Sequence, residues 1–246
     1  MRQSVFFGVA LTVSLIVSYV IYSTLLPEHV KAGGPLVVLL IALSLLAVTF
    51  IIERYIALKR AEGRKNIQGF VKGFREDMEA GRVREAIERC NQQGGALANV
   101  LRAGLESFQE AMDSDMTTYE KQDVTRRAIE EANALEAPLL ERNLIALSTI
   151  ASIATMVGLL GTTLGMIRSF GAMATTGAPD AIQLALGISE ALVNTAGGLF
   201  VAIAAIVAYN YYVNKVDALN YTIDEVAQEM LEKFTKKMRG TRRAQA

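Results

Sequence analysis

The placement of charged side chains along the chain constrains its fold more than any other feature of the sequence. The 246 residues carry 25 basic and 25 acidic side chains, so the net charge is zero and indicates no class of partner. Charges are nearly absent from four stretches, which are residues 4–26, 35–52, 144–167 and 184–213. They gather instead in residues 53–142 and 214–246. Apolar stretches of this length, joined by charged segments, are typical of membrane-spanning helices. We therefore expect an all-helical integral membrane protein.

The residues that usually carry enzyme chemistry are scarce. There is one cysteine, Cys90, and one histidine, His29, which excludes a disulfide framework within the chain and a metal site built from histidine and cysteine. The GxxxxGK[ST], HExxH and GxSxG motifs are absent from the sequence. We expect no enzymatic activity, no cofactor, no metal site and no nucleic-acid partner.

The first apolar stretch, Ser4–Leu26, contains 23 uncharged residues. As a helix it would be about 35 Å long, enough to cross a hydrocarbon core of about 30 Å. The alternative is a cleaved signal peptide, because Arg2 provides a short basic start. The stretch is long for a signal core and lacks a clear small-x-small cleavage site, so we expect it to be retained as a span.

The basic residues predict how the spans are oriented. The polar turn Pro27–Gly34 would join the first two spans into a hairpin, and the second span is followed by Lys59, Arg60, Arg64 and Lys65. The positive-inside rule places this cluster in the cytoplasm. The third span would then run outward, turn over Arg168–Gln183, and return as the fourth, with both termini cytoplasmic. The expected segments are 1–34, 35–53, 54–142, 143–213 and 214–246.

The charged segments are also predicted to be helical. Residues 54–142 have apolar side chains near helical spacing, and Asn91–Gly95 is the best break among them. From about Thr117 the pattern runs to Asn143 without a strong stop, so we expect one long helix to enter the third span. After Val213, apolar residues recur at steps of three and four: Leu219, Ile223, Val226, Met230, Leu231 and Phe234. This spacing predicts that the fourth span continues as a helix that packs on the cytoplasmic helices.

The third span carries hydroxyl side chains along one face. They recur at offsets of 0, 4, 7, 14 and 21, at Ser148, Ser152, Thr155, Thr162 and Ser169. Such hydroxyls either bond carbonyls of their own helix or form a polar wall that faces water or a partner helix. The stripe alone leaves both interpretations open. The same span contains Gly158, Gly161 and Gly165, and glycines at this spacing let a neighbouring backbone approach closely.

The fourth span has a second stripe of small residues, at Ala191, Thr195, Gly198, Ala202 and Ala205. Glu190 lies inside this span, about six residues from its outer end. A carboxylate within a membrane is costly unless it is paired, hydrated or neutral. Asn194 is one turn further on and could share its hydrogen bonds. These residues favour equally a structural hydrogen bond near the interface and a place in an ion path.

Two segments together resemble the paired signature of the MotA/TolQ/ExbB proton-channel family. Gly158–Ile167 reads Gly-Leu-Leu-Gly-Thr-Thr-Leu-Gly-Met-Ile, and Gly187–Ala196 reads Gly-Ile-Ser-Glu-Ala-Leu-Val-Asn-Thr-Ala. Both halves occur in the family's order, and Val201–Tyr211 resembles the end of the same span. The resemblance is strong over about 140–215 and is one of layout only over 35–139.

The resemblance implies an ExbB/TolQ-like subunit of a proton-driven motor in a bacterial inner membrane. Five copies would surround two single-span helices of an ExbD/TolR-like partner, whose membrane aspartate carries the proton, and the work would pass to a TonB-like or Tol/Pal-like protein. Thr162 and Thr195 fall on the family's pore threonines and Glu190 on its glutamate, which gives the expected proton pathway. Residues that would line or support the pore are Ser152, Thr155 and Asn194. Residues that would pack the helices are Gly158, Gly161, Gly165 and Gly198.

The sequence departs from the family pattern in two places. The family often has Ala-Pro where this chain has Ala154-Thr155, so we expect no proline kink in the third span. The commonest layout has three spans with an outer N-terminus, and Ser4–Leu26 would add a fourth.

Other functions remain open from the sequence. A passive scaffold would need the small-residue stripes but not Glu190 or the hydroxyls. A secondary transporter would show broken helices and inverted repeats, which the sequence does not. Within the family, the sequence does not distinguish an ExbB-like role in outer-membrane uptake from a TolQ-like role in envelope maintenance or a more specialised motor, and it does not separate proton from sodium coupling. The match is to the ExbB/TolQ form of the motif, which disfavours a flagellar MotA-like role.

Overall fold

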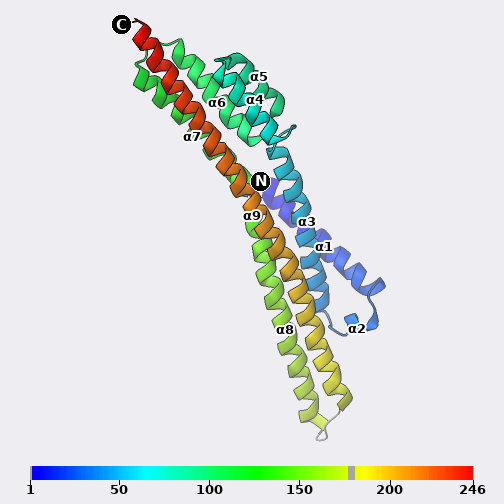
Figure 1. Cartoon of the computed structure of the whole chain (residues 1–246). Coiled ribbons are helices and arrows are strands. Elements are labelled where there is room, and N and C mark those ends of the chain that lie inside the picture. Colours follow the sequence, from blue (N-terminus) through cyan, green and yellow to red (C-terminus); the bar gives the residue numbers. More distant parts are fainter. Residues whose placement is uncertain (1, 177–180, 246) are drawn as a thin grey trace. The chain divides into compact units, whose positions relative to one another are not determined.

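The computed structural model describes residues 2–176 and 181–245 (Figure 1). The secondary structure of this part of the chain consists of helices, which confirms the all-helical fold. The helices are α1 (Arg2–Thr24), α2 (Glu28–Lys31), α3 (Leu36–Ala61), α4 (Ile67–Glu79), α5 (Val83–Gln93), α6 (Gly95–Met112), α7 (Thr118–Glu141), α8 (Leu144–Thr176) and α9 (Ala181–Gln245).

The helices form two compact units. The first, which we call the apolar unit, contains the chain up to Arg54 and from Asn143 to Tyr212. The second, the charged unit, contains Tyr55–Arg142 and the chain from Val213 onward. Both α3 and α9 contribute to the two units, because each helix continues from a long apolar stretch into a charged one.

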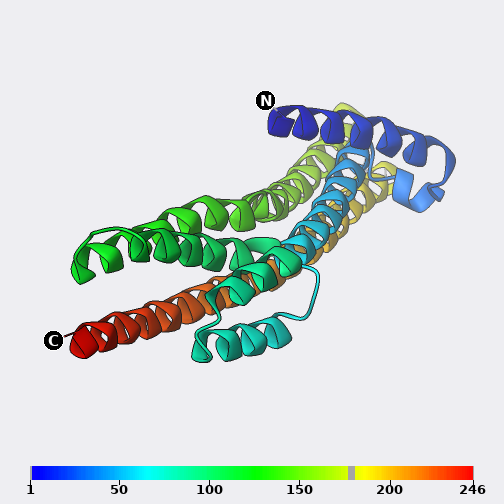
Figure 2. The ribbon, with the colours of Figure 1, turned by 90° about the horizontal axis from the view of Figure 1, so that it is seen from above.

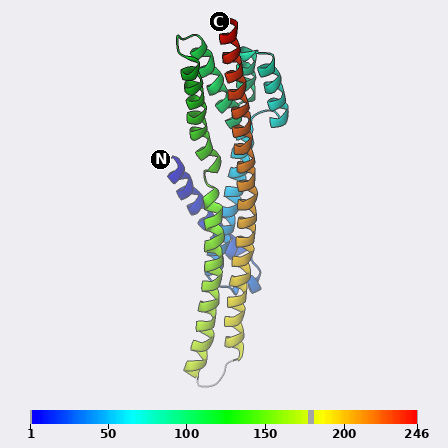
Figure 3. The ribbon, with the colours of Figure 1, turned by 60° about the vertical axis from the view of Figure 1, so that its left-hand side comes forward.

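The core of the apolar unit is made by α3, α8 and the first part of α9. α8 and α9 lie side by side (Figures 1 and 3). Phe50 of α3, Leu147 of α8 and Ala205 of α9 are among the fully buried side chains. The Tyr212 hydroxyl donates a hydrogen bond of 2.8 Å to the Ile51 carbonyl, which fastens α9 to α3. α8 runs through Thr155 without interruption, as expected from the missing proline.

Among the described residues, three helical stretches are long and apolar enough to cross a membrane: Leu36–Ala61, Thr118–Gly171 and Ala181–Lys236. The second includes both α7 and α8, and its long uncharged stretch, residues 144–167, lies in α8. Within α1, the apolar stretch found among the described side chains is Gly8–Thr24, which is shorter than these three. Three candidate spans are therefore shown, and the fourth, over Ser4–Leu26, stays a prediction.

Two expected boundaries in the chain are corrected. The helix from Thr117 into the third span is not continuous, because it ends at Glu141 and α8 begins at Leu144. Between them Arg142 has a ψ of 137°, outside the helical region, and Asn143 has a φ of 63°, in the left-handed region that interrupts a helix. The turn expected over Arg168–Gln183 is also shorter, because α8 continues to Thr176 and α9 begins at Ala181. α8 can continue through residues 168–176 because this segment contains no proline, which would stop the helix.

In the charged unit, α4 contacts α5, α5 contacts α6, and α6 contacts α7. Figure 2 shows α6 beside α7. The predicted break at Asn91–Gly95 is confirmed, because α5 ends at Gln93 and α6 begins at Gly95. Both Gly94 and Gly95 have positive φ values, of 62° and 85°, which only glycine adopts readily.

The apolar face predicted for the end of α9 packs into the charged unit. Of its six residues, Leu231 is half-buried and the others are buried: Leu219, Ile223, Val226, Met230 and Phe234. A Cβ atom on Gly104 of α6 would lie 2.5 Å from the Met230 Cε, so these helices pack closely. At the rim, Arg75 of α4 bonds Glu229 at 2.7 Å and Glu225 at 3.2 Å.

A buried carboxylate holds α4 to α5. Asp77 accepts hydrogen bonds from Arg82 at 2.7 Å and from Arg89 at 2.6 Å. Burial by itself raises the pKa of the Asp77 carboxyl, but the hydrogen bonds and charges of Arg89 and Arg82 outweigh it and hold the pKa below its usual value. The carboxylate therefore remains ionised although it is almost completely shielded from water.

Candidate functional site

Glycines bring α8 and α9 into backbone contact along the two motif segments. A Cβ atom on Gly158 would lie 3.3 Å from the Gly198 Cα, and one on Gly198 would lie 2.6 Å from the Ala154 carbonyl oxygen. A Cβ on Gly165 would lie 2.6 Å from the Gly187 carbonyl oxygen. Any larger residue at these positions would force the helices apart. The structure thus places Gly158, Gly165 and Gly198 where the two helices meet.

Gly161 faces a polar side chain. A Cβ atom there would collide with the Cβ of Asn194, so glycine is required for the asparagine to fit between the helices. Asn194 is completely buried. Its Nδ2 donates hydrogen bonds to the Gly33 carbonyl at 2.8 Å and to the Glu190 carbonyl at 3.0 Å. One amide group therefore contacts α8, α9 and the turn before α3.

The orientation of the Asn194 amide follows from these bonds. Both neighbours are carbonyl oxygens, which accept hydrogen bonds, so the amide nitrogen has to face them. The Oδ1 atom is left buried with no hydrogen-bond partner in the described part of the chain. Asn194 was predicted as a supporting residue, but its link to Gly33 could not be read from the sequence, because 161 positions separate the two residues.

Glu190 is paired with a base. Its Oε1 lies 2.5 Å from the Arg168 Nη1, and Glu190 is 8% exposed while the Arg168 side chain is 57% exposed. Gly34, with a φ of 71°, lies beside the same carboxylate oxygen. The sequence left two roles open for Glu190. This ion pair favours the structural role, because the charge of Arg168 already compensates that of the carboxylate.

Sequence reasoning did not assign Arg168 to the site. The signal was present, because Arg168 is the single basic residue between the two motif segments. A buried carboxylate within an apolar helix requires a partner, and α8 and α9 run side by side there. A search for that partner would have led to Arg168.

Three hydroxyls of the α8 stripe bond carbonyls of their own helix. Ser152 donates to Ser148 at 3.1 Å, Thr155 to Ala151 at 3.1 Å and Thr162 to Leu159 at 2.6 Å. Such bonds satisfy the hydroxyl hydrogen but leave the oxygen's lone pairs available. Ser152 is exposed and Thr162 is half-buried, so other groups can reach them.

Ser169 of the stripe instead donates to the Leu184 carbonyl of α9 at 3.2 Å. Thr195 likewise forms a bond that crosses between the helices. Its Oγ1 donates to the Gly158 carbonyl at 3.4 Å, and its side chain is half-buried. Gly158 lies one helical turn before Thr162, so the two threonines lie at neighbouring levels of the α8–α9 pair. The arrangement offers two polar hydroxyls on an apolar helix pair, and within the described residues no cluster of side chains could hold a metal ion.

Comparison with known proteins supports a single family. Residues 92–225 match the model of the MotA/TolQ/ExbB proton channel family. An ExbB-like biopolymer transport protein of Synechocystis sp. is 36% identical over 185 residues, which cover 74% of this chain and 81% of that protein. The Tol-Pal system protein TolQ of Pseudomonas aeruginosa is 31% identical, with 82% of this chain and 90% of TolQ covered.

A third relative, the biopolymer transport protein ExbB of Pseudomonas putida, is 30% identical over 61% of this chain and 45% of its own length. The family match covers the two segments that meet in the α8–α9 pair, with Gly158, Thr162, Glu190 and Thr195 among them. The chain belongs to the MotA/TolQ/ExbB proton channel family and is an ExbB/TolQ-like member of it.

Proposed function

We propose that this chain is the channel-forming subunit of a proton-driven motor in a bacterial inner membrane. The observation that carries the proposal is the α8–α9 pair, where the two motif segments pack through glycine and hold Thr162 and Thr195 at neighbouring levels. Charge placement supports an orientation with the charged unit and both termini in the cytoplasm. On this proposal the chain is not an enzyme and uses no cofactor.

The proton-carrying carboxylate is proposed to belong to another chain. The four apolar stretches of this sequence contain no aspartate, and Glu190, the acid within them, is paired with Arg168. An ExbD/TolR-like partner with one membrane helix and an aspartate in it would supply the missing group. Five copies of this chain around two such helices would form the complete motor.

The exposed surface of α8 and α9 suits assembly in a membrane. Its large apolar side chains are more than half exposed in the single chain, as at Met156, Leu159, Leu192, Phe200 and Ile203. Such a surface needs lipid or other apolar helices against it. A ring of copies would cover part of it and enclose the partner helices.

In the proposed cycle, the threonine hydroxyls contact the partner's aspartate as it moves past the apolar wall. The hydroxyl hydrogens are used by the Leu159 and Gly158 carbonyls, so the oxygens can accept a hydrogen bond from the protonated carboxyl. Protonation of the partner's aspartate from the outer side removes the cost of a charge in an apolar setting. The partner helix can then turn past the wall. Release of the proton to the cytoplasm restores the charge and completes the step.

Glu190 is proposed to position the channel helices rather than to carry protons. Its pairing with Arg168 joins α8 to α9, and Asn194 joins α9 to Gly33. Together they would keep the helix pair rigid while the partner helices move. Ser152 and Thr155 would extend the polar face of α8 from Thr162 toward the N-terminal end of that helix.

The test is reconstitution of this chain with its partner in lipid vesicles. We expect proton uptake when both are present, and loss of uptake when the partner's membrane aspartate is changed to asparagine. A passive scaffold would hold the partner without any flux. In cells, a protonophore should abolish the coupled work while the assembly remains intact, and continued work under the protonophore would contradict the motor.

The branch of the family is a separate question. A TonB-like protein encoded beside this chain would indicate active import across the outer membrane, and a Pal-like protein would indicate envelope maintenance. Either neighbour is compatible with the α8–α9 geometry.

A further inference from the structure

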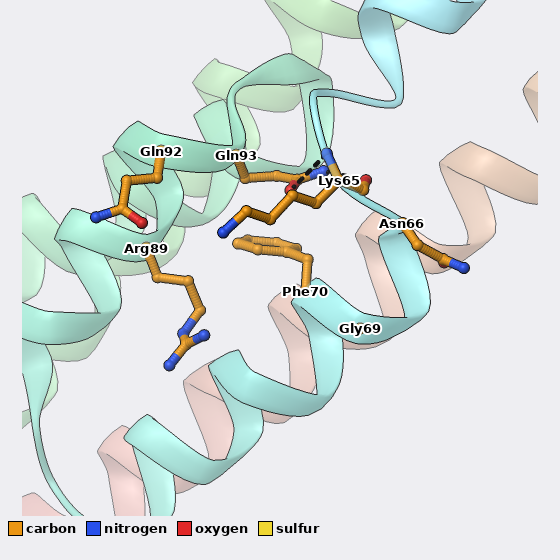
Figure 4. Close-up of a pocket in the computed structure, with 7 residues that line it drawn as sticks. All are labelled: Lys65, Asn66, Gly69, Phe70, Arg89, Gln92 and Gln93. Atoms are coloured by element: carbon orange, nitrogen blue, oxygen red, sulfur yellow. Dashed lines mark hydrogen bonds between the residues drawn. The ribbon is translucent and has the colours of Figure 1, made fainter.

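Two adjacent cavities in the charged unit meet at the loop that follows α3. The larger has a volume of about 620 Å³, and its walls include Tyr55, Ile56, Lys59, Arg60 and Arg64. The smaller has a volume of about 310 Å³. Figure 4 shows the smaller cavity, with Lys65, Phe70 and Arg89 around it. We call the larger one the basic cavity.

The charge of the basic cavity is strongly positive. Three cationic side chains, Lys59, Arg60 and Arg64, line it, and none of the residues described as lining it is acidic. The nearest acid along the loop, Glu62, is bound to Lys215 at 2.9 Å and does not neutralise these bases. A cavity of this composition attracts an anion.

The loop that carries Arg64 is held in place by one buried side chain. Gln93, which is 3% exposed, donates from Nε2 to the Glu62 carbonyl at 3.0 Å and to the Lys65 carbonyl at 2.8 Å. Its Oε1 accepts from the Lys65 amide at 3.2 Å, and its own carbonyl accepts from the Arg64 amide at 2.9 Å. Figure 4 shows Gln93 against Lys65.

Glycine lets this loop pack directly on the α5–α6 turn. A Cβ atom on Gly63 would lie 2.5 Å from the Gly94 carbonyl oxygen. The backbone that carries Arg64 is therefore held in place before a ligand binds. Such preorganisation lowers the entropy cost of binding.

The position of the cavity along α3 relates it to the membrane surface. The apolar stretch from Leu36 to Ile52 is about 26 Å long as a helix, close to the thickness of a hydrocarbon core. Lys59 follows Ile52 by seven residues, or about 10 Å, which reaches the head-group layer. If α3 spans the bilayer, this rise places the basic cavity at the level of the lipid phosphates.

The cavity also has an apolar wall that continues from the span. Tyr55 and Ile56 are 52% and 43% exposed, and the Lys59 Nζ lies 5.8 Å from the centre of the Tyr55 ring. Tyrosine is enriched at membrane interfaces, where its ring is apolar and its hydroxyl is hydrated. A free phosphate would make no use of this wall, whereas the glycerol and upper acyl chains of a lipid would.

We propose that the basic cavity binds the head group of an anionic phospholipid from the leaflet at the charged end of α3. Arg60 and Arg64 contact the phosphate, Lys59 adds charge, and the acyl chains leave past Tyr55 and Ile56 toward the apolar surface of α3. Basic pockets at the cytoplasmic ends of membrane helices bind such lipids. The site is separate from Thr162 and Thr195. The lipid-binding proposal can therefore be tested independently of the proposed channel function.

The experiment measures lipid retained by the purified full-length protein. Equimolar phosphatidylglycerol and phosphatidylcholine with the same acyl chains are added in detergent, and bound lipid is counted by native mass spectrometry. We expect phosphatidylglycerol to be preferred, and the Arg60→Gln, Arg64→Gln double variant to weaken its binding about tenfold. The matched control, Lys72→Gln with Arg84→Gln, removes two exposed basic charges from α4 and α5 and should retain the lipid.

Two further arms identify the ligand. Ile56→Ser keeps every charge and should still weaken phosphatidylglycerol binding, because it removes part of the apolar wall. Millimolar inorganic phosphate should not displace the lipid. Equal loss in the control variant, no preference over phosphatidylcholine, or displacement by phosphate would each overturn the proposal. If the arginine variant does not fold, the Ile56→Ser variant still tests the proposal, because unchanged phosphatidylglycerol binding in that folded protein would contradict it.

Discussion

The Asn194 side chain packs directly against Gly161, so a side chain cannot be added at Gly161 without displacing it. We expect Gly161→Ala to destabilise the protein by about 1–3 kcal/mol, because the added methyl group collides with the Asn194 Cβ. Gly171, also in α8, has open space around an added Cβ and serves as the control. Thermal unfolding of both variants in detergent measures the difference. Equal melting temperatures would show that α8 and α9 do not meet closely at Gly161.

Cys90 of α5 should be almost unreactive in the folded protein. Burial raises the pKa of its thiol to about 12, against the opposing effect of Arg102 and Arg89. Because the thiolate is the reactive form, we expect iodoacetamide at pH 8 to modify the native protein at least about 100-fold more slowly than the denatured protein. Mass spectrometry over time gives both rates. Comparable rates would mean that α5 opens readily.

Asp77 should make the charged unit sensitive to acid. Its native pKa is lowered, so its contribution to stability is fully present above the ordinary aspartate pKa of about 3.9 and is lost as the pH falls through the native value. We therefore expect Asp77→Asn to be destabilising at pH 7, with a smaller effect at pH 3. Thermal unfolding at both values tests this, with Asp115→Asn, an exposed change of the same charge, as control. An effect that grows toward pH 3 would contradict the pairing with Arg82 and Arg89.

At the scale of the elements, the helical periodicity of the sequence predicted the end of α9 well but did not predict the break between α7 and α8. The steps from Leu219 to Phe234 predicted a buried face because an apolar stripe on a charged helix has to be covered. The break at Arg142 and Asn143 escaped prediction because neither residue is a strong helix breaker. Only the backbone geometry, with φ of 63° at Asn143, reveals it.

That break leads to a prediction about Asn143. Asparagine tolerates the left-handed region better than alanine does, and glycine adopts it without strain. We expect Asn143→Ala to be less stable than Asn143→Gly by about 1 kcal/mol, since both lose the same side-chain contacts and differ in backbone strain. Chemical unfolding of the two variants gives this difference. A more stable alanine variant would indicate a continuous helix from α7 to α8.

At the scale of the whole molecule, the sequence predicted the membrane helices and the family, and the structure added the contacts. Hydropathy and charge are properties of local sequence, so Leu36–Ala61 and Ala181–Lys236 could be recognised directly. Contacts between distant residues, such as Asn194 with Gly33, have no local signal. The ion pair of Glu190 with Arg168 likewise depends on two helices lying side by side.

The central claim is that Thr162 and Thr195 line the proton path. Valine preserves the shape of threonine and removes its hydroxyl, so a Thr162→Val, Thr195→Val protein should still assemble with its partner. Thr163 and Thr149 provide the matched control, because each is in α8, is exposed and bonds a carbonyl of its own helix at 2.8 Å. The decisive measurement is proton uptake by vesicles that contain this chain and the partner. We predict that proton uptake falls at least about tenfold in the Thr162, Thr195 variant, because the partner's carboxyl loses its hydrogen-bond acceptors. Uptake should stay near normal in the control. Unchanged uptake in the Thr162, Thr195 variant would contradict the account.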